Sequence, residues 1–170
     1  MVKFKCNTMK KLRVLFLVIV LLQSCIETLP DEELSVKRMP YYGKEIRIDG
    51  YYKGLGIAQK EYFDYIFFYN NGIYFRFGYT DVDNINKIED IINHSRSNKQ
   101  NWGVFQISDT LVNIQRWTQN AGTTQNMVLH IRYVIIDDTT LFYKDLGGDT
   151  TRYHFVKYNP KPDSTNVFIK

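Results

Sequence analysis

Cys25 is the residue whose position points most directly to chemistry. It follows the apolar stretch Val14–Leu22, which itself follows the basic residues of Met9–Arg13. A membrane-spanning helix needs about 20 apolar residues, so a stretch of nine predicts the core of a secretory signal peptide instead. The only other cysteine, Cys6, lies upstream of the expected cleavage, so the mature domain is expected to have no disulfide and no thiol nucleophile. The sequence leaves open whether translation starts at Met1 or Met9.

The run Leu22-Gln23-Ser24-Cys25 resembles the end of bacterial lipoprotein signal peptides, which place an aliphatic residue three positions before an invariant cysteine and a small residue directly before it. The resemblance implies that residues 1–24 are removed and that Cys25 becomes a lipidated N-terminus. Two or more acyl chains give stable membrane anchoring. Ile26 is not the Asp associated with inner-membrane retention, so the resemblance implies an outer-membrane location and leaves the periplasmic or surface face open.

The overall layout, from these residues to the ending Lys161–Asn166, is similar to that of a group of small uncharacterised bacterial envelope lipoproteins. This resemblance implies an address for the protein and brings no activity with it. The charge of the mature chain agrees with that address. The sequence has 22 Lys and Arg against 18 Asp and Glu, but five of the bases lie in residues 1–24, so cleavage leaves 17 bases against 18 acids. A nearly neutral chain gives no electrostatic reason to expect a nucleic-acid partner.

The histidines do not predict a metal site. His94, His130 and His154 have neither helical i, i+4 spacing nor a cysteine partner, although His130 and His154 lie on expected strands that could share a face. The sequence contains no Gly-x-Ser-x-Gly nucleophile elbow and no glycine-rich phosphate loop. We therefore expect a non-enzymatic protein without a cofactor.

Aromatic residues are the one unusual feature of the composition, at 15% of the chain. The candidate ligand-binding residues are Tyr65, Phe67, Phe75, Phe77, Trp102 and Trp117. Such rings could line a pocket for an apolar ligand or a surface for a glycan, and buried tyrosines usually find a polar partner. They could equally be packing residues of a closed sheet.

Two proline-containing segments flank a long proline-free stretch. Residues 25–40 hold two of the four prolines and a cluster of charges, so they are expected to form a flexible, lipid-anchored tether. The stretch 41–159 contains no proline, as a continuous hydrogen-bonded sheet requires. The tail, 160–170, is expected to pack on the domain.

The stretch 41–159 predicts eight antiparallel strands joined by short turns. They are Glu45–Tyr52, Tyr62–Tyr69, Ile73–Tyr79, Trp102–Ser108, Leu111–Trp117, Met127–Ile136, Leu141–Leu146 and Arg152–Tyr158. A three-residue loop, Asn70-Asn71-Gly72, places Tyr65 and Phe67 beside Phe77 and Phe75 on one apolar face. We expect this aromatic face to point inward.

One short amphipathic helix is expected after the third strand, within Thr80–His94. Val82, Ile85, Ile88 and Ile92 recur at helical spacing, and Thr80 with Asp83 resembles a capping box. This helix could plug one end of the fold.

Eight consecutive antiparallel strands favour an up-and-down β-barrel, with a two-sheet sandwich as the alternative. In outline the pattern resembles the lipocalin-like, or calycin, group, whose Gly-x-Trp signature is missing; here Trp102-Gly103 occurs on the fourth strand. A barrel of this size can be filled by side chains or hold one small ligand. The sequence thus predicts a membrane-anchored envelope lipoprotein that binds a small apolar or glycan ligand. The alternative is a structural subunit that docks on a protein partner in the envelope.

Overall fold

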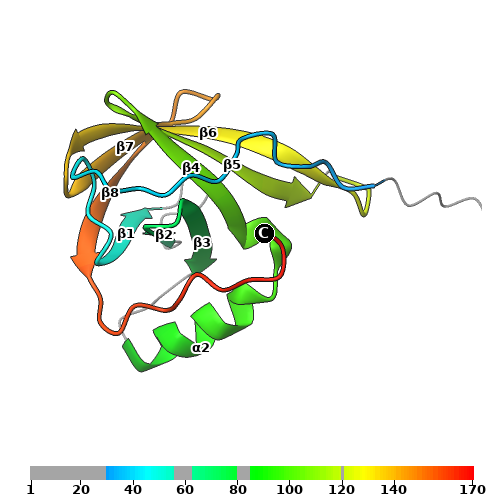
Figure 1. Ribbon diagram of the computed structural model, residues 1–170, viewed down its shortest axis with the longest axis horizontal. Coiled ribbons are helices and arrows are strands. Elements are labelled where there is room, and N and C mark those ends of the chain that lie inside the picture. Colours follow the sequence, from blue (N-terminus) through cyan, green and yellow to red (C-terminus); the bar gives the residue numbers. More distant parts are fainter. Residues whose placement is uncertain (1–29, 56–62, 80–84, 120) are drawn as a thin grey trace, which may run out of the picture. The chain divides into compact units, whose positions relative to one another are not determined.

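The computed structural model describes residues 30–55, 63–79, 85–119 and 121–170. Cys25, the leader and the capping pair Thr80 and Asp83 lie outside these residues, as does Val82. Residues 31–170 form one compact unit. Its strands are β1 (Gly50–Leu55), β2 (Phe63–Phe68), β3 (Ile73–Tyr79), β4 (Trp102–Ser108), β5 (Leu111–Gln119), β6 (Asn126–Asp137), β7 (Thr140–Lys144) and β8 (Thr150–Lys157), with helix α2 (Ile85–Arg96) and the short 3-10 helix η1 (Lys99–Asn101) between β3 and β4 (Figure 1).

The eight strands form a closed barrel in chain order. Each strand pairs antiparallel with the next, and β8 pairs with β1 to close the ring. The predicted eight-stranded antiparallel meander is therefore confirmed, and the sandwich alternative is wrong. Closure leaves no complete edge strand open to another chain.

The first strand starts later than predicted, at Gly50 instead of Glu45. The alternating residues Ile46, Arg47 and Ile48 resemble a strand, but the backbone N–H of Arg47 donates to the hydroxyl of Tyr52 (2.9 Å) and to the carbonyl of Asp138 (3.1 Å). These bonds hold the segment across one end of the barrel. Ile46 is buried there in the barrel core.

The register of the β2–β3 hairpin agrees with the sequence pattern. Tyr65 pairs with Phe77 and Phe67 with Phe75, around a turn in which Gly72 has a φ of 81°. A side chain at this position would be strained by the positive φ, and its Cβ would lie 2.1 Å from the carbonyl oxygen of Met39.

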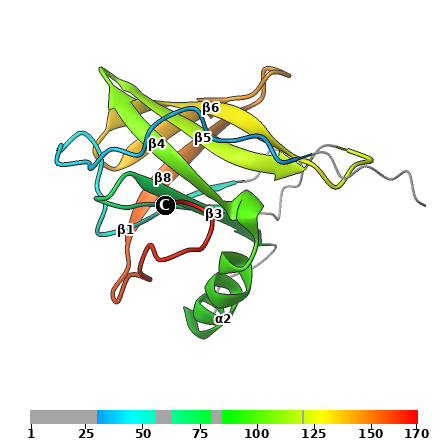
Figure 2. The same ribbon diagram turned by 45° about the vertical axis from the view of Figure 1, so that its right-hand side comes forward.

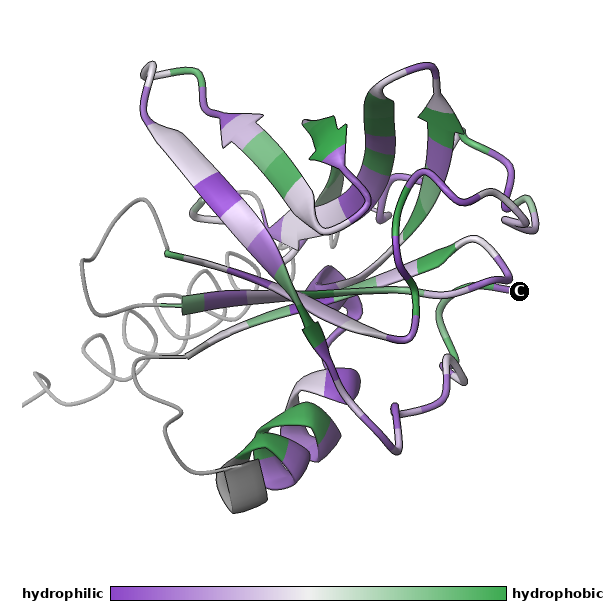
Figure 3. Cartoon of the chain, turned by 90° about the vertical axis from the view of Figure 1, so that its left-hand side faces the viewer, coloured by the Kyte–Doolittle hydropathy of each residue, from purple (hydrophilic) through white to green (hydrophobic). Residues whose placement is uncertain are grey.

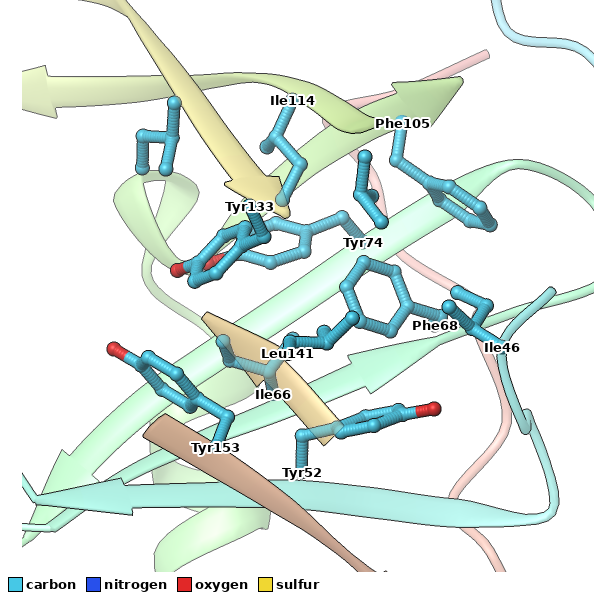
Figure 4. Packing of buried hydrophobic residues seen from close by; sticks show 12 residues of the cluster. Ile46, Tyr52, Ile66, Phe68, Tyr74, Phe105, Ile114, Tyr133, Leu141 and Tyr153 are labelled. Carbon is cyan, nitrogen blue, oxygen red and sulfur yellow. The ribbon is translucent and has the colours of Figure 1, made fainter. Parts of the chain in front are cut away.

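The two faces of this hairpin are reversed relative to the prediction. A set of buried residues that we call the inner cluster has members from all eight strands and therefore lies inside the barrel (Figure 4). Its members are Ile46, Tyr52, Ile66, Phe68, Tyr74, Phe105, Val112, Ile114, Ile131, Tyr133, Leu141 and Tyr153.

The aromatic face lies on the outside of the barrel instead. It belongs to a second set, the outer cluster, to which β1 to β4 and α2 contribute. The members of the outer cluster are Tyr51, Tyr65, Phe67, Tyr69, Ile73, Phe75, Phe77, Ile88, Ile92 and Trp102. The prediction that the aromatic face points inward is therefore wrong.

Helix α2 supplies the cover that makes this arrangement stable. It lies against the outer side of β2 and β3 and does not plug an end of the barrel (Figures 1 and 2). Its apolar and polar bands are visible in Figure 3, and Ile88 and Ile92 are buried in the outer cluster. At the C-terminal end of α2, the carbonyl of Arg96 accepts a hydrogen bond from the indole N–H of Trp102 (2.8 Å). An amphipathic helix needs an apolar partner, and the outward aromatic face provides it.

The segment 31–40 is held on the barrel, whereas the sequence predicts it to be part of a flexible tether. It runs along β4, β5 and β6 (Figure 1). The backbone N–H of Val36 donates to the Gln115 side chain (2.7 Å), and the indole N–H of Trp117 donates to the carbonyl of Glu32 (2.8 Å). The prediction failed because charged residues do not exclude a segment from backbone pairing with polar side chains on a strand.

The tail, 160–170, lies over the outer cluster, where Phe168 and Ile169 pack against it. The ammonium group of Lys161 donates to the carbonyls of Ile48 (2.5 Å) and Phe68, and it lies 4.2 Å from the ring centroid of Tyr69. Burial lowers the pKa of Lys161 from 10.5 to about 8. The aromatic face is thus covered by two elements that follow it in the chain.

Candidate functional site

Five of the six predicted ligand-binding residues lie together, but they are not accessible. Tyr65, Phe67, Phe75, Phe77 and Trp102 all belong to the outer cluster and expose between 0% and 2% of their surface. Their rings pack on one another, as in the stack of Tyr65 on Phe77 at 4.9 Å. In this structure they are packing residues beneath α2 and the tail.

Trp117 lies apart from the other five. Its indole donates to Glu32, and the ammonium group of Lys99 lies 4.4 Å from its ring centroid. The ring thus anchors the segment 31–40 to β5. Cys25, the predicted lipidation residue, lies outside the described residues.

A different group of side chains gathers inside the barrel, and we call it the interior polar cluster. It consists of Asp64 on β2, Tyr74 and Arg76 on β3, Arg116 on β5, Tyr133 on β6 and Tyr153 on β8. Alternation along the strands brings them to the inner face, because Ile66, Ile114 and Phe68 of the same parity belong to the inner cluster. In Figure 4 the hydroxyls of Tyr74, Tyr133 and Tyr153 point the same way, opposite to that of Tyr52.

Asp64 is the centre of the hydrogen bonding in the interior polar cluster. It is 2% exposed, accepts from Arg76 Nε (2.6 Å) through Oδ1, and accepts from the Tyr153 hydroxyl (2.8 Å) through Oδ2. Burial lowers the pKa of Arg76, but the attraction of Asp64 more than offsets this and carries the pKa above its usual value. The pair therefore compensates the buried carboxylate of Asp64, while Arg76 keeps 30% of its side-chain surface exposed.

The phenols of the cluster are held in their protonated form. Burial raises the pKa of Tyr74 to about 12, and it raises the pKa values of Tyr133 and Tyr153 as well. At neutral pH these hydroxyls are therefore protonated and can donate hydrogen bonds, and that of Tyr153 donates to Asp64.

Arg116 differs from Arg76 in forming no ion pair with a carboxylate of the described residues. Its Nη1 donates to two neutral carbonyls, those of Gln100 (3.2 Å) and Trp117 (2.9 Å). Its buried Nε has no hydrogen-bond partner. The buried hydroxyl of Tyr74 makes no well-formed hydrogen bond, although the hydroxyl of Tyr133 lies beside it. Burial lowers the pKa of Arg116, which expresses the cost of an uncompensated cation. The interior polar cluster therefore holds two guanidinium groups and one carboxylate.

Gly103 lies between Tyr74 and Arg116 and allows β4 and β5 to approach each other closely. It pairs with Tyr74 of β3 on one side and with Arg116 of β5 on the other, so the three residues form one row across three strands. A Cβ on Gly103 would lie 2.3 Å from the carbonyl oxygen of Gln115 and 2.8 Å from Cβ of Arg116, so only glycine fits there. The row thus has a side chain at each end and none in the middle.

Three surface pockets are also present, with volumes of about 350, 340 and 240 Å³. The largest lies where the β6–β7 ladder ends, and its lining includes the cationic residues Arg132 and Lys144 with Tyr143. The ring of Tyr143 lies 5.3 Å from that of Tyr133. Tyr143, which lines this pocket, therefore contacts Tyr133 of the interior polar cluster.

The histidines do not converge in the structure. His130 lies 3.2 Å from the Gln115 side-chain nitrogen, while His154 on β8 pairs with Lys53 and Thr140. Within the described ranges, no group of three or more His, Cys, Asp or Glu side chains is placed to hold a metal ion. No helix in that part of the chain is long and apolar enough to cross a membrane.

Comparison of the chain with protein-family models, with curated proteins and with solved structures gave no match. The fold therefore stands on its own geometry as a closed, mainly β barrel with one covering helix.

The interior polar cluster is not among the sites that the sequence predicts. The hairpin register already places Asp64 and Arg76 on the face opposite the aromatic residues. Charged residues are usually exposed, so the pattern predicts the all-apolar aromatic face, and not this mixed face, to point inward. The signal that could have predicted the cluster is the placement of Asp64 and Arg76 on the same face of the β2–β3 hairpin.

Proposed function

We propose that the protein is a membrane-anchored envelope lipoprotein whose barrel binds a small ligand at the interior polar cluster. The observation that carries this proposal is the pair of buried groups without a well-formed hydrogen bond, Arg116 Nε and the Tyr74 hydroxyl. Buried polar groups in native proteins are almost always paired, so such groups point to a bound molecule or ion. An eight-stranded barrel has the diameter to hold one small ligand. The proposed role is binding, and no reaction is assigned to the site.

The anchor rests on the sequence around Cys25. Metabolic labelling with palmitate is expected to mark the protein, and Cys25→Ala is expected to abolish the label because the acylated thiol is lost. Cys6→Ala is the matched control and should leave the label unchanged, since Cys6 lies in the predicted leader. Labelling that survives Cys25→Ala would refute the proposed anchor at Cys25 but would not bear on the barrel fold.

Ligand binding is tested on the acylated protein purified from membranes. Native mass spectrometry is expected to show the protein with an added small-molecule mass, which disappears after unfolding and refolding in clean buffer. The refolded protein should melt at a lower temperature, because a ligand that binds only the native state stabilises it. A bare mass before unfolding, with an unchanged melting temperature, would contradict the proposal.

Docking on a protein partner is the second candidate, and a specific surface supports it. Leu129, Val134 and Ile136 of β6 and Leu146 after β7 are exposed apolar residues. Asp31 and Glu32 bond to the backbone of Asn126 and Val128 at the start of β6. The β6 residues from Leu129 to Tyr133 pair with β5 and have no described ladder partner on the β7 side, and such an edge can accept a strand from another chain. A complex that Leu129→Lys disrupts, in protein whose ligand mass is unchanged, would support docking as a separate role.

A further inference from the structure

We propose that the ligand carries a single carboxylate on an apolar body, and that this carboxylate pairs with Arg116 and accepts a hydrogen bond from the Tyr74 hydroxyl. This inference rests on the proposed ligand-binding function and names the chemical class of the ligand.

The charges of the cluster define the charge of the ligand. The carboxylate of Asp64 is fully used by Arg76 Nε and by the Tyr153 hydroxyl. Arg116 contributes a second cation, which donates only to carbonyls and which Asp64 attracts without forming an ion pair with it. A buried ion is costly unless an opposite charge accompanies it. One added negative charge makes the cluster neutral, whereas a dianion would leave an excess negative charge.

The hydrogen-bond donors define the shape of the ligand's charged group. Nη1 of Arg116 is occupied by two carbonyls, and Nε lies on the remaining part of the guanidinium fork. A carboxylate is planar and accepts on two oxygens, which suits a guanidinium on one side and a further donor on the other. The Tyr74 hydroxyl is such a donor, because its raised pKa keeps it protonated at neutral pH.

The strand geometry places the two groups in one row across the barrel wall. Tyr74 and Arg116 lie two strands apart in one row, with Gly103 between them. Neighbouring strands are about 4.8 Å apart, so the two Cα atoms are separated by roughly 10 Å. Gly103 puts no side chain into this interval. A carboxylate between the two side chains could contact both.

The surroundings explain the apolar body. The inward residues beside the row belong to the apolar inner cluster, with Phe68 of β2 paired with Tyr74 and Ile114 two residues from Arg116 on β5. Apart from the interior polar cluster, Tyr52 is the only inner-cluster residue with a polar side chain, and its hydroxyl already donates to the Asp138 carbonyl (2.6 Å). A strongly hydroxylated ligand would find few partners beyond the polar end.

The test compares dodecanoate with dodecanol, which has the same chain length and no charge. The protein is the mature chain from residue 25 carrying Cys25→Ser, so that no attached acyl chain competes, and binding is measured by titration calorimetry after removal of bound lipid. Dodecanoate is expected to bind at least tenfold more tightly than dodecanol, which is the scale of one charge-assisted hydrogen bond.

The variants locate the charge recognition. Arg116→Gln should remove the preference for dodecanoate while leaving dodecanol binding unchanged, and Arg116→Lys should keep part of it. Tyr74→Phe removes only the hydroxyl and should weaken dodecanoate roughly threefold to tenfold. Arg132→Gln is the control for general surface charge, because Arg132 is exposed on β6, and it should keep the full preference.

The outcomes separate the two proposals. Equal binding of both probes by the unsubstituted chain would overturn the carboxylate inference and leave a neutral ligand for the barrel. A preference that survives Arg116→Gln would overturn it as well, since the charge would then be read elsewhere. Failure of both probes to bind would also overturn the carboxylate inference. The ligand-binding function itself would be refuted only if, in addition, native mass spectrometry of the membrane-purified protein showed no added ligand mass. If Arg116→Gln does not fold, as judged by circular dichroism, the Tyr74→Phe result decides.

Discussion

The substitution Asp64→Asn offers a sharp test of the buried ion pair. It keeps the size of the side chain and its ability to accept from Tyr153, but it removes the charge that faces Arg76 Nε at 2.6 Å. Removing one partner of a buried pair costs roughly 3–5 kcal/mol, because the other charge remains without compensation. Arg76 keeps 30% of its side-chain surface exposed, so we expect a loss at the lower end, about 3 kcal/mol.

The assay is equilibrium unfolding in guanidinium chloride, read by circular dichroism. A compact unit of this size is stabilised by roughly 7–20 kcal/mol, so the expected loss is easily measured. Asp49→Asn is the matched control, because the Arg47–Asp49 pair has the same 2.6 Å separation but exposes 38% and 49% of its side chains. Exposed pairs contribute about 0–1 kcal/mol. Equal losses for the two substitutions would refute the assignment of Asp64 to the barrel interior.

Three further predictions concern the segments that cover the barrel. Burial lowers the pKa of Lys161 from 10.5 to about 8. Between these two pH values the unfolded chain binds more protons at Lys161 than the folded chain does, so the free energy of unfolding should rise with pH from about 8 toward 10. Lys161→Met should remove this rise, as measured by thermal melts. Gly72 and Gly122 both have a φ of 81°, but only at Gly72 would a Cβ meet backbone; Gly72→Ala should therefore cost clearly more than the roughly 1–2 kcal/mol of conformational strain expected for Gly122→Ala in denaturant unfolding. Hydrogen bonds from Lys99 and from the backbone amide of Asn126 lower the pKa of Asp31 from 3.8 to about 2. The segment 31–36 should therefore detach from the barrel as the pH falls from about 4 to 2. This should appear as a red shift of Trp117 fluorescence emission, and the shift should be smaller in Asp31→Asn.

The strand pairing could be predicted from the sequence because local features determine it. The Asn70-Asn71-Gly72 turn fixes the β2–β3 register, and the two-residue turn at Asp109-Thr110 fixes the pairing of Phe105 with Ile114. Gly72 adopts the positive φ that such turns require. Alternation then determines which residues share a face.

The side on which each face lies could not be predicted in the same way. Both faces of β2 and β3 carry large apolar residues, so hydropathy does not separate the face inside the barrel from the face covered on the outside. The decision depends on α2 and the tail, which pack on Phe67 and Phe75 from distant parts of the chain. The candidate site was missed for the same reason. Which groups surround Arg116 depends on which strands face one another across the barrel, and the spacing of residues along the chain does not predict this.

The central claim is that an external carboxylate compensates Arg116 inside the barrel. The most direct measurement is a crystal structure of the protein purified from its own membranes without added ligand. We predict density for a small molecule whose carboxylate lies about 3 Å from both Arg116 Nε and the Tyr74 hydroxyl. A side-chain carboxylate of the chain itself at that position, or an interior filled by side chains alone, would contradict the account.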